Sequence, residues 1–190
     1  MQTSTDKRTV FFHEDDYCQQ EILAPDSESF AAEQNEKIQE FSEEHKAPGG
    51  AGWTDMYVRE SVDKPLDLKL QQLKQVLAPI VPQYDEVYTG YGSSYRELCP
   101  NTLAWGINNE CAIYADYDTE ENVTTLWVDF FDRDNIDTAC KIIEALAQIN
   151  AFVYVDWAWD YQQLITDVNI FREYLTDKLD YICNWPLEKI

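Results

Sequence analysis

The chain has 190 residues, of which 45% are hydrophobic and 14% aromatic, enough to bury the core of one domain. Its 14 Lys and Arg against 36 Asp and Glu give a formal net charge of −22. This charge argues against direct binding to nucleic acid or anionic lipid, and the aromatic content argues against a disordered acidic tail.

Targeting signals and cysteine frameworks are not apparent in the sequence. The first residues, MQTSTDKRTVFF, contain bases but no apolar segment typical of a signal peptide. The longest uncharged apolar run, Ala145–Val155, is shorter than the roughly 20 residues that a membrane-spanning helix requires. Five cysteines without a CxxC pair favour neither disulfides nor a Cys-rich zinc site. We therefore expect a soluble, cytoplasmic protein.

The first elements predicted along the chain are two short strands, Thr9–Phe12 and Tyr17–Leu23, joined by His13–Asp16. A helix follows over Pro25–His45, with a thin apolar stripe on an otherwise charged surface. The glycine-rich segment Lys46–Gly52 predicts a flexible loop.

The next segment alternates like a strand over Thr54–Glu60. Asp63 and Pro65 then open a predicted helix. Its buried stripe consists of leucines spaced i, i+4, i+7 and i+11, namely Leu66, Leu70, Leu73 and Leu77.

Four strands are predicted in the second half, at Glu86–Tyr91, Thr102–Ile107, Glu110–Tyr117 and Thr124–Phe131. Asn108-Asn109 predicts a tight hairpin between the second and third of these strands.

The last predicted elements are a buried helix at Asn135–Ile149, a strand at Phe152–Trp157 and an amphipathic helix at Tyr161–Ile182. This order mixes hairpins with crossovers. It predicts a single α+β domain over residues 1–190, with a mostly antiparallel sheet packed by about four helices.

Catalytic and metal sites have little support. Phe11–Tyr17, FFHEDDY, puts His13 beside three carboxylates, but the other histidine, His45, is on a different predicted element, and zinc sites usually need more than one His or Cys. We predict no metal, no cofactor and no enzyme activity, with a role for His13 left as an alternative. Acid–base chemistry by paired carboxylates also stays open, because 36 acids make some close pair inevitable.

A repeated pattern of an aromatic residue followed two positions later by Asp is more informative. It places Tyr114 with Asp116, Trp127 with Asp129 and Tyr154 with Asp156. Because side chains alternate across a strand, each pair lies on one face, and we predict one exposed aromatic–acidic surface that binds a partner. Three residues after the last strand extend it, namely Trp157, Trp159 and Asp160. A helix covering this face is the alternative.

The acids near this pattern are poorly compensated, since Glu97–Asp167 contains 14 acids and two bases, a net charge of −12. FFHEDDY, the segment Gly52–Tyr57 (GWTDMY) and the acidic aromatic strands YADYD and LWVDFFDRD resemble those of the single-domain immunity proteins that bacteria encode beside polymorphic or contact-dependent toxins. The resemblance implies a cytoplasmic antidote that binds one toxin domain.

We therefore expect an acidic protein-binding module, an immunity protein that neutralises a basic cognate toxin by occluding its active site. One alternative is an acidic DNA mimic that sequesters a DNA-binding protein. An enzyme with paired carboxylates is the other.

Overall fold

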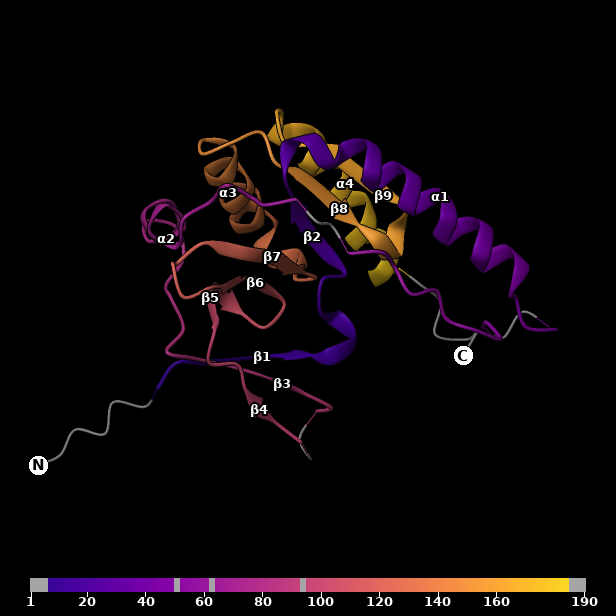
Figure 1. Ribbon diagram of the computed structural model, residues 1–190, viewed down its shortest axis with the longest axis horizontal. Coiled ribbons are helices and arrows are strands. Elements are labelled where there is room, and N and C mark those ends of the chain that lie inside the picture. Colours follow the sequence, from indigo (N-terminus) through magenta and orange to yellow (C-terminus); the bar gives the residue numbers. More distant parts are fainter. Residues whose placement is uncertain (1–6, 50–51, 62–63, 93–94, 185–190) are drawn as a thin grey trace, which may run out of the picture.

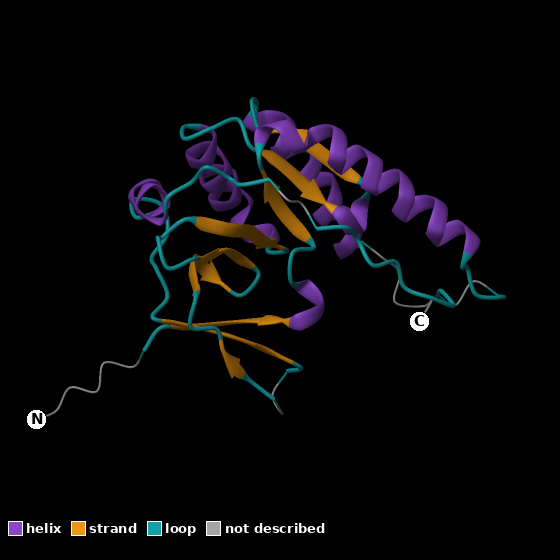
Figure 2. Ribbon diagram, in the orientation of Figure 1, coloured by secondary structure: helices purple, strands orange, loops and turns teal. Residues whose placement is uncertain are grey.

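The predicted combination of a mostly antiparallel sheet with helices is confirmed by the computed structural model, which describes residues 7–49, 52–61, 64–92 and 95–184 (Figure 1). Within this part of the chain, helices and strands form an α+β domain (Figure 2). The α-helices are α1 (Glu28–Glu44), α2 (Leu70–Leu77), α3 (Ile136–Ala147) and α4 (Val168–Cys183).

The larger sheet has six antiparallel strands in the order β5-β6-β7-β2-β8-β9. Their bounds are β2 (Gln20–Leu23), β5 (Thr102–Asn108), β6 (Cys111–Tyr117), β7 (Val123–Phe130), β8 (Val153–Asp156) and β9 (Tyr161–Leu164). In the smaller sheet, β3 pairs in parallel with β1 and antiparallel with β4. Their bounds are β1 (Thr9–His13), β3 (Glu86–Gly90) and β4 (Glu97–Leu98).

Both faces of the larger sheet are covered (Figure 1). Helices α2, α3 and α4 contribute to the apolar core on one face, against residues such as Ile113 and Val128. On the other face, β1 and β3 pack against Tyr114 and Trp127, and α1 packs against the region of β8. Because successive side chains point to opposite faces, strands such as β6 are apolar almost throughout.

Strand β2 holds the two halves of the larger sheet together. It pairs with β8 over all four of its residues but with β7 only where Glu21 lies opposite Trp127. The first two predicted strands therefore exist but lie in different sheets, joined by the 3₁₀ turn Glu14–Asp16.

Two predictions in the segment before β3 are wrong. Thr54–Glu60 forms no strand. The segment instead contacts other elements through individual side chains; Arg59, for example, forms an ion pair with Glu21 of β2, in which Nη1 and Oε2 are 3.1 Å apart. The helix begins at Leu70, because the preceding segment pairs with the β6–β7 turn, where Val123 N donates to Leu68 O at 2.9 Å. Asp63, its predicted start, lies outside the described residues.

The predicted final helix also starts later than expected. Tyr161–Leu164 is strand β9, which pairs along β8, and α4 begins after Asp167, whose side chain accepts from Asn169 N. Asp160 makes the reversal between the strands in a left-handed conformation with φ of 49°. Sequence periodicity missed β9 because its side chains are all half-buried. It also missed the two-residue strand β4.

Two predicted connections are present in modified form. The β5–β6 hairpin pairs Asn108 with Cys111, so its turn is one residue later than predicted. The predicted loop Lys46–Gly52 is closed by a hydrogen bond of 2.9 Å from Ala47 N to Gly52 O. Residues 50 and 51 of this loop lie outside the described residues.

Gly106 of β5 lies against the β6 backbone, and we expect Gly106→Ala to lower the free energy of unfolding by about 1–3 kcal/mol. A Cβ atom there would be 2.4 Å from Cys111 O and 2.7 Å from Ala112 Cα, so the strands would have to separate. Urea denaturation measures the loss, with Thr124→Ala at an exposed position of β7 as the control. Equal stability of the two variants would show that the hairpin can relax.

Candidate functional site

The three predicted aromatic–aspartate pairs lie largely in the interior. Tyr114, Trp127 and Tyr154 are 0% exposed, and Asp129 and Asp156 are 4% and 1% exposed. The prediction of one exposed binding face is therefore wrong. The alternative, a helix over this face, holds only for Tyr154, which packs against Phe171 of α4; Tyr114 and Trp127 are covered by β1 and β3.

The pairs also do not share one face of the sheet. Glu21 of β2 lies opposite both Trp127 and Val155, so these two side chains point to the same side. Tyr154 points to the other side, where its ring centroid is 5.0 Å from that of Phe171 on α4. The sequence could not reveal this, because the register is set through β2, which lies far away in the chain.

Tyr114 and Trp127 form an aromatic cluster beneath β1. Their rings stack with centroids 5.2 Å apart. Phe12 packs edge-on against both, at 5.4 Å and 5.5 Å, and Tyr17 reaches Trp127 at 4.8 Å. Such offset and edge-to-face contacts are the preferred arrangements of aromatic rings, so this cluster ties the two sheets together.

A pocket of about 350 Å³ lies beside the aromatic cluster. We call it the Asp116 pocket; it is lined by Phe12, Glu14, Tyr17, Thr89, Cys99, Thr102, Asp116 and Trp127. These residues come from both sheets and from the turn that joins β1 to β2. Of the predicted strand residues, Asp116 alone is only partly buried.

The Asp116 carboxylate is held in a defined position. Its Oδ1 accepts a hydrogen bond of 2.5 Å from Thr102 Oγ1, and its Oδ2 accepts one of 3.1 Å from Tyr17 OH. Burial raises the pKa of Asp116, and these two hydrogen bonds offset the effect only in part. Among the described residues, no ion pair involves Asp116, so this desolvated carboxylate has hydroxyl donors but no cation beside it.

A second polar cluster is fully internal. Asp156 of β8 forms an ion pair with Lys178 of α4, and both side chains are 1% exposed. Asp156 Oδ2 also accepts a hydrogen bond of 2.8 Å from Tyr174 OH. Burial lowers the pKa of Lys178, and the Asp156 charge opposes this change. Nearby Asp129 has a pKa raised to about 8, chiefly by burial.

The three residues predicted to extend the binding surface after β8 differ in their exposure to solvent. Trp157 is 6% exposed; its Nε1–H donates to Glu21 Oε2 at 3.2 Å, and the Arg59 guanidinium lies 4.3 Å from its ring centroid. Trp159 and Asp160, by contrast, are exposed. The predicted surface loop is thus limited to these last two residues.

Trp159 belongs to an exposed group of rings that we call the aromatic patch, formed by Phe131, Trp159 and Tyr181. Their exposed fractions are 39%, 36% and 52%. Trp159 and Tyr181 meet edge-on at 5.4 Å, and Lys178 Nζ lies 4.8 Å from the Phe131 ring centroid and 5.9 Å from that of Trp159. Each ring has an aspartate as its chain neighbour: Asp132, Asp160 and Asp180.

Sequence reasoning missed Phe131 and Tyr181. Tyr181 lies outside the apolar stripe of the last helix, and an aromatic residue on a polar helix face is a signal that could have identified it. Phe131 directly follows β7, where alternation ceases to predict orientation. The packing of α4 brings Tyr181 against Trp159 and places Lys178 Nζ near the rings of both Phe131 and Trp159.

His13 has a structural role in this fold. Its Nδ1 accepts a hydrogen bond of 3.2 Å from Asp15 N and so caps the 3₁₀ turn Glu14–Asp16. Within the described ranges, no group of three or more His, Cys, Asp or Glu side chains is arranged to hold a metal ion. Within FFHEDDY, Glu14–Asp16 turns the chain between the two sheets.

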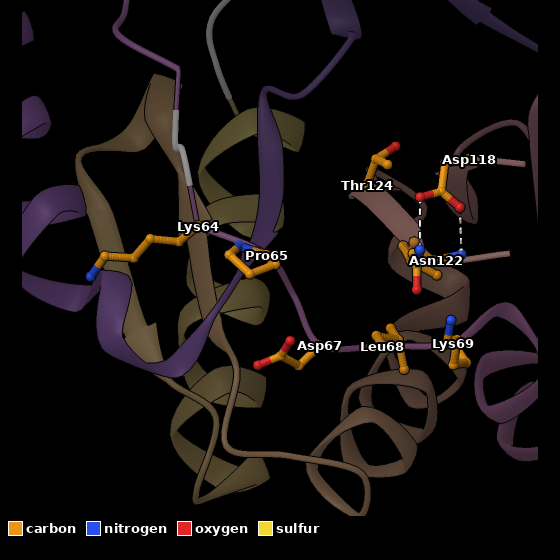
Figure 3. A pocket seen from close by; sticks show the side chains of 9 residues that line it. Lys64, Pro65, Asp67, Leu68, Lys69, Asp118, Asn122 and Thr124 are labelled. Atoms are coloured by element: carbon orange, nitrogen blue, oxygen red, sulfur yellow. Dashed lines mark hydrogen bonds between the residues drawn. The ribbon is translucent and has the colours of Figure 1, made fainter. Parts of the chain in front are cut away.

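A pocket next to the N-terminal end of α2 is lined by side chains of both charges. It measures about 630 Å³ and includes Lys64, Asp67 and Lys69. Asp118 in its wall is hydrogen-bonded to Asn122, with Oδ2 and Nδ2 2.7 Å apart, while Lys64 extends away from this pair (Figure 3). Its polar groups mainly stabilise the β6–β7 turn.

Across the described ranges, no helix is both long enough and apolar enough to cross a membrane. No protein-family model, curated protein or solved structure matches the chain.

Proposed function

We propose that this protein is an acidic binding module that neutralises a basic partner, a toxin domain, in the cytoplasm by covering its active site. The observation that carries the proposal is the aromatic patch, whose three exposed rings each adjoin an aspartate in the chain. Contiguous exposed apolar groups rimmed by polar ones mark interaction sites. The resemblance to immunity proteins suggests the class of partner.

The rings of the aromatic patch suit a tight protein interface. Trp and Tyr supply large contact areas and are enriched among the residues that dominate binding energy. The edge-on contact of Trp159 with Tyr181 holds both rings in place, which reduces the ordering cost of binding.

The charge of the chain supports a basic partner. The net charge is −22 overall and −12 over Glu97–Asp167, a range that contains Phe131 and Trp159. Such a field accelerates encounter with a positively charged protein and repels competing nucleic acid. An antidote that must reach a nucleic-acid-acting toxin quickly benefits from both effects.

The test is co-expression with the product of the neighbouring gene in the source genome. We expect that product to stop growth when expressed alone, and this protein to restore growth and to co-elute with it. A harmless neighbour that forms no complex would contradict the proposed function. A complex from which duplex DNA displaces this protein would favour the DNA-mimic alternative.

Within that complex, Trp159→Ala is expected to weaken binding by at least about 2 kcal/mol, or roughly 30-fold, if Trp159 is a dominant contact. Trp53→Ala is the matched control, because Trp53 is 64% exposed and lies outside the aromatic patch. Surface plasmon resonance in two salt concentrations would measure both variants. Equal weakening by the two substitutions, or none by Trp159→Ala, would exclude the aromatic patch as the binding surface.

A further inference from the structure

The chain twice combines a carboxylate, an aromatic ring and a basic side chain into one unit. In the first unit, Arg59 Nη1 is 3.1 Å from Glu21 Oε2, and the guanidinium lies 4.3 Å from the Trp157 ring centroid. The ring attracts the cation through its quadrupole while the carboxylate supplies the opposite charge. Trp157 Nε1–H also donates to the same carboxylate.

The second unit uses an ammonium group. Lys178 pairs with Asp156, and Lys178 Nζ lies 4.8 Å from the Phe131 ring centroid. Here the hydroxyl of Tyr174 donates to the same carboxylate oxygen. In both units a buried or nearly buried carboxylate accepts a hydrogen bond from an aromatic side chain. A basic side chain that lies against an aromatic ring neutralises the carboxylate.

The Asp116 pocket contains the first two components of such a unit. The Tyr17 hydroxyl donates a hydrogen bond to Asp116, and Tyr17 is 43% exposed. No basic residue in the described part of the chain forms an ion pair with Asp116. The geometry points to a binding site for one alkyl-ammonium or guanidinium group, supplied by a Lys or Arg side chain of a protein or by a free amine.

The lining can hold such a group without disturbing the core. Each carboxylate oxygen of Asp116 uses one lone pair for the bond to Thr102 or Tyr17, which leaves acceptor capacity for a cation. Glu14 adds a second acid to the lining. Phe12 and Trp127 are only 5% and 0% exposed, so the cation would contact chiefly the Tyr17 ring and the Asp116 carboxylate.

The size of the pocket agrees with this ligand class. Its volume of about 350 Å³ is at the lower end of the range for small-ligand sites, about 300–1,000 Å³. The Tyr17 ring and the Cys99 side chain in its lining offer apolar contact for the methylene stem of an amine. Burial raises the pKa of Asp116, and a bound cation would reverse this effect by stabilising the carboxylate.

The direct test titrates the isolated protein with n-butylguanidinium and n-butylammonium while NMR follows the Tyr17, Thr102 and Trp127 signals. We expect saturable shifts that Asp116→Asn weakens at least about tenfold, the effect of losing a charge-assisted contact. Asp177→Asn, at an exposed position of α4, is the matched control and should bind normally. The neutral analogue n-butylurea should cause no saturable shift.

Two further variants keep the test decisive if Asp116→Asn fails to fold. Tyr17→Phe keeps the ring and should retain most of the binding, whereas Tyr17→Leu removes the ring and should lose most of it. Equal binding of n-butylurea, or unchanged affinity in both Asp116→Asn and Tyr17→Leu, would overturn the inference.

A second experiment distinguishes the two sources of the cation. Weaker affinity of the Asp116→Asn variant for the basic partner identifies a partner side chain as the ligand, whereas unchanged affinity together with n-butylguanidinium binding identifies a free amine. The titration with small cations requires no partner. Its failure would therefore leave the proposed function and the aromatic patch untouched.

Discussion

Replacing Lys178 with Met is expected to lower the free energy of unfolding by about 3–5 kcal/mol. Lys178 and Asp156 form an ion pair in which both side chains are 1% exposed. Removal of the ammonium leaves the Asp156 carboxylate buried without a cation, although Tyr174 still donates a hydrogen bond to it at 2.8 Å. Urea denaturation followed by tryptophan fluorescence would measure the loss.

Two comparisons identify the cause of this loss. Lys141→Met, at an exposed position of α3, should change stability by less than about 0.5 kcal/mol. The double variant Lys178→Met with Asp156→Asn should recover much of the stability, because a neutral amide needs no cation. If the double variant is as unstable as Lys178→Met alone, the loss arises from side-chain packing and not from the unpaired charge.

Asp129→Asn is expected to make the protein more stable at pH 8 and to reduce the dependence of its stability on pH. Burial, and to a smaller extent the Asp16 charge, raise the pKa of Asp129 from its usual 3.8 to about 8, although Tyr114 and Lys178 act in the opposite direction. The folded protein therefore binds a proton at Asp129 that the unfolded chain has already released.

The sign of this effect follows from proton binding. Where the folded state binds more protons, stability falls as pH rises, by up to about 1.4 kcal/mol per pH unit for one group. The loss begins above pH 3.8 and is complete above about pH 8. Asparagine has no proton to lose, so its variant should lack this contribution.

Unfolding free energies at pH 5 and pH 8 test the prediction for Asp129. The comparison must be made between variants, because general repulsion among 36 acids acts in the same direction in each. Asp177→Asn, at an exposed position, should show the same pH dependence as the original protein. Parallel pH profiles for the original protein and Asp129→Asn would mean that Asp129 is ionised in the folded state.

The candidate sites could be predicted only in part. The aromatic–aspartate pattern pointed to Asp116, which is partly buried, and its extension into the following loop pointed to Trp159 and Asp160, which are exposed. The pattern did not predict that Tyr154 is buried. Alternation shows which side chains of a strand share a face, but it does not show which element covers that face. Tyr17, which contacts Asp116, lies 99 residues away in the chain, and Tyr181, which contacts Trp159, lies on a different element, α4. No local pattern reports such contacts.

The sequence by itself determined the fold class and most of its elements. Apolar periodicity and turn residues are local properties, and they were sufficient for α1, α3 and strands β5 to β8. Only the tertiary structure decided which elements cover each face of the larger sheet. Strand β2, from the start of the chain, enters between β7 and β8, and its register orients Tyr154 towards α4 and Trp127 towards β1. Burial in this domain depends on that long-range pairing. Acids that look alike in sequence therefore become an ion-paired Asp156, a buried Asp129 with a raised pKa and a partly buried Asp116.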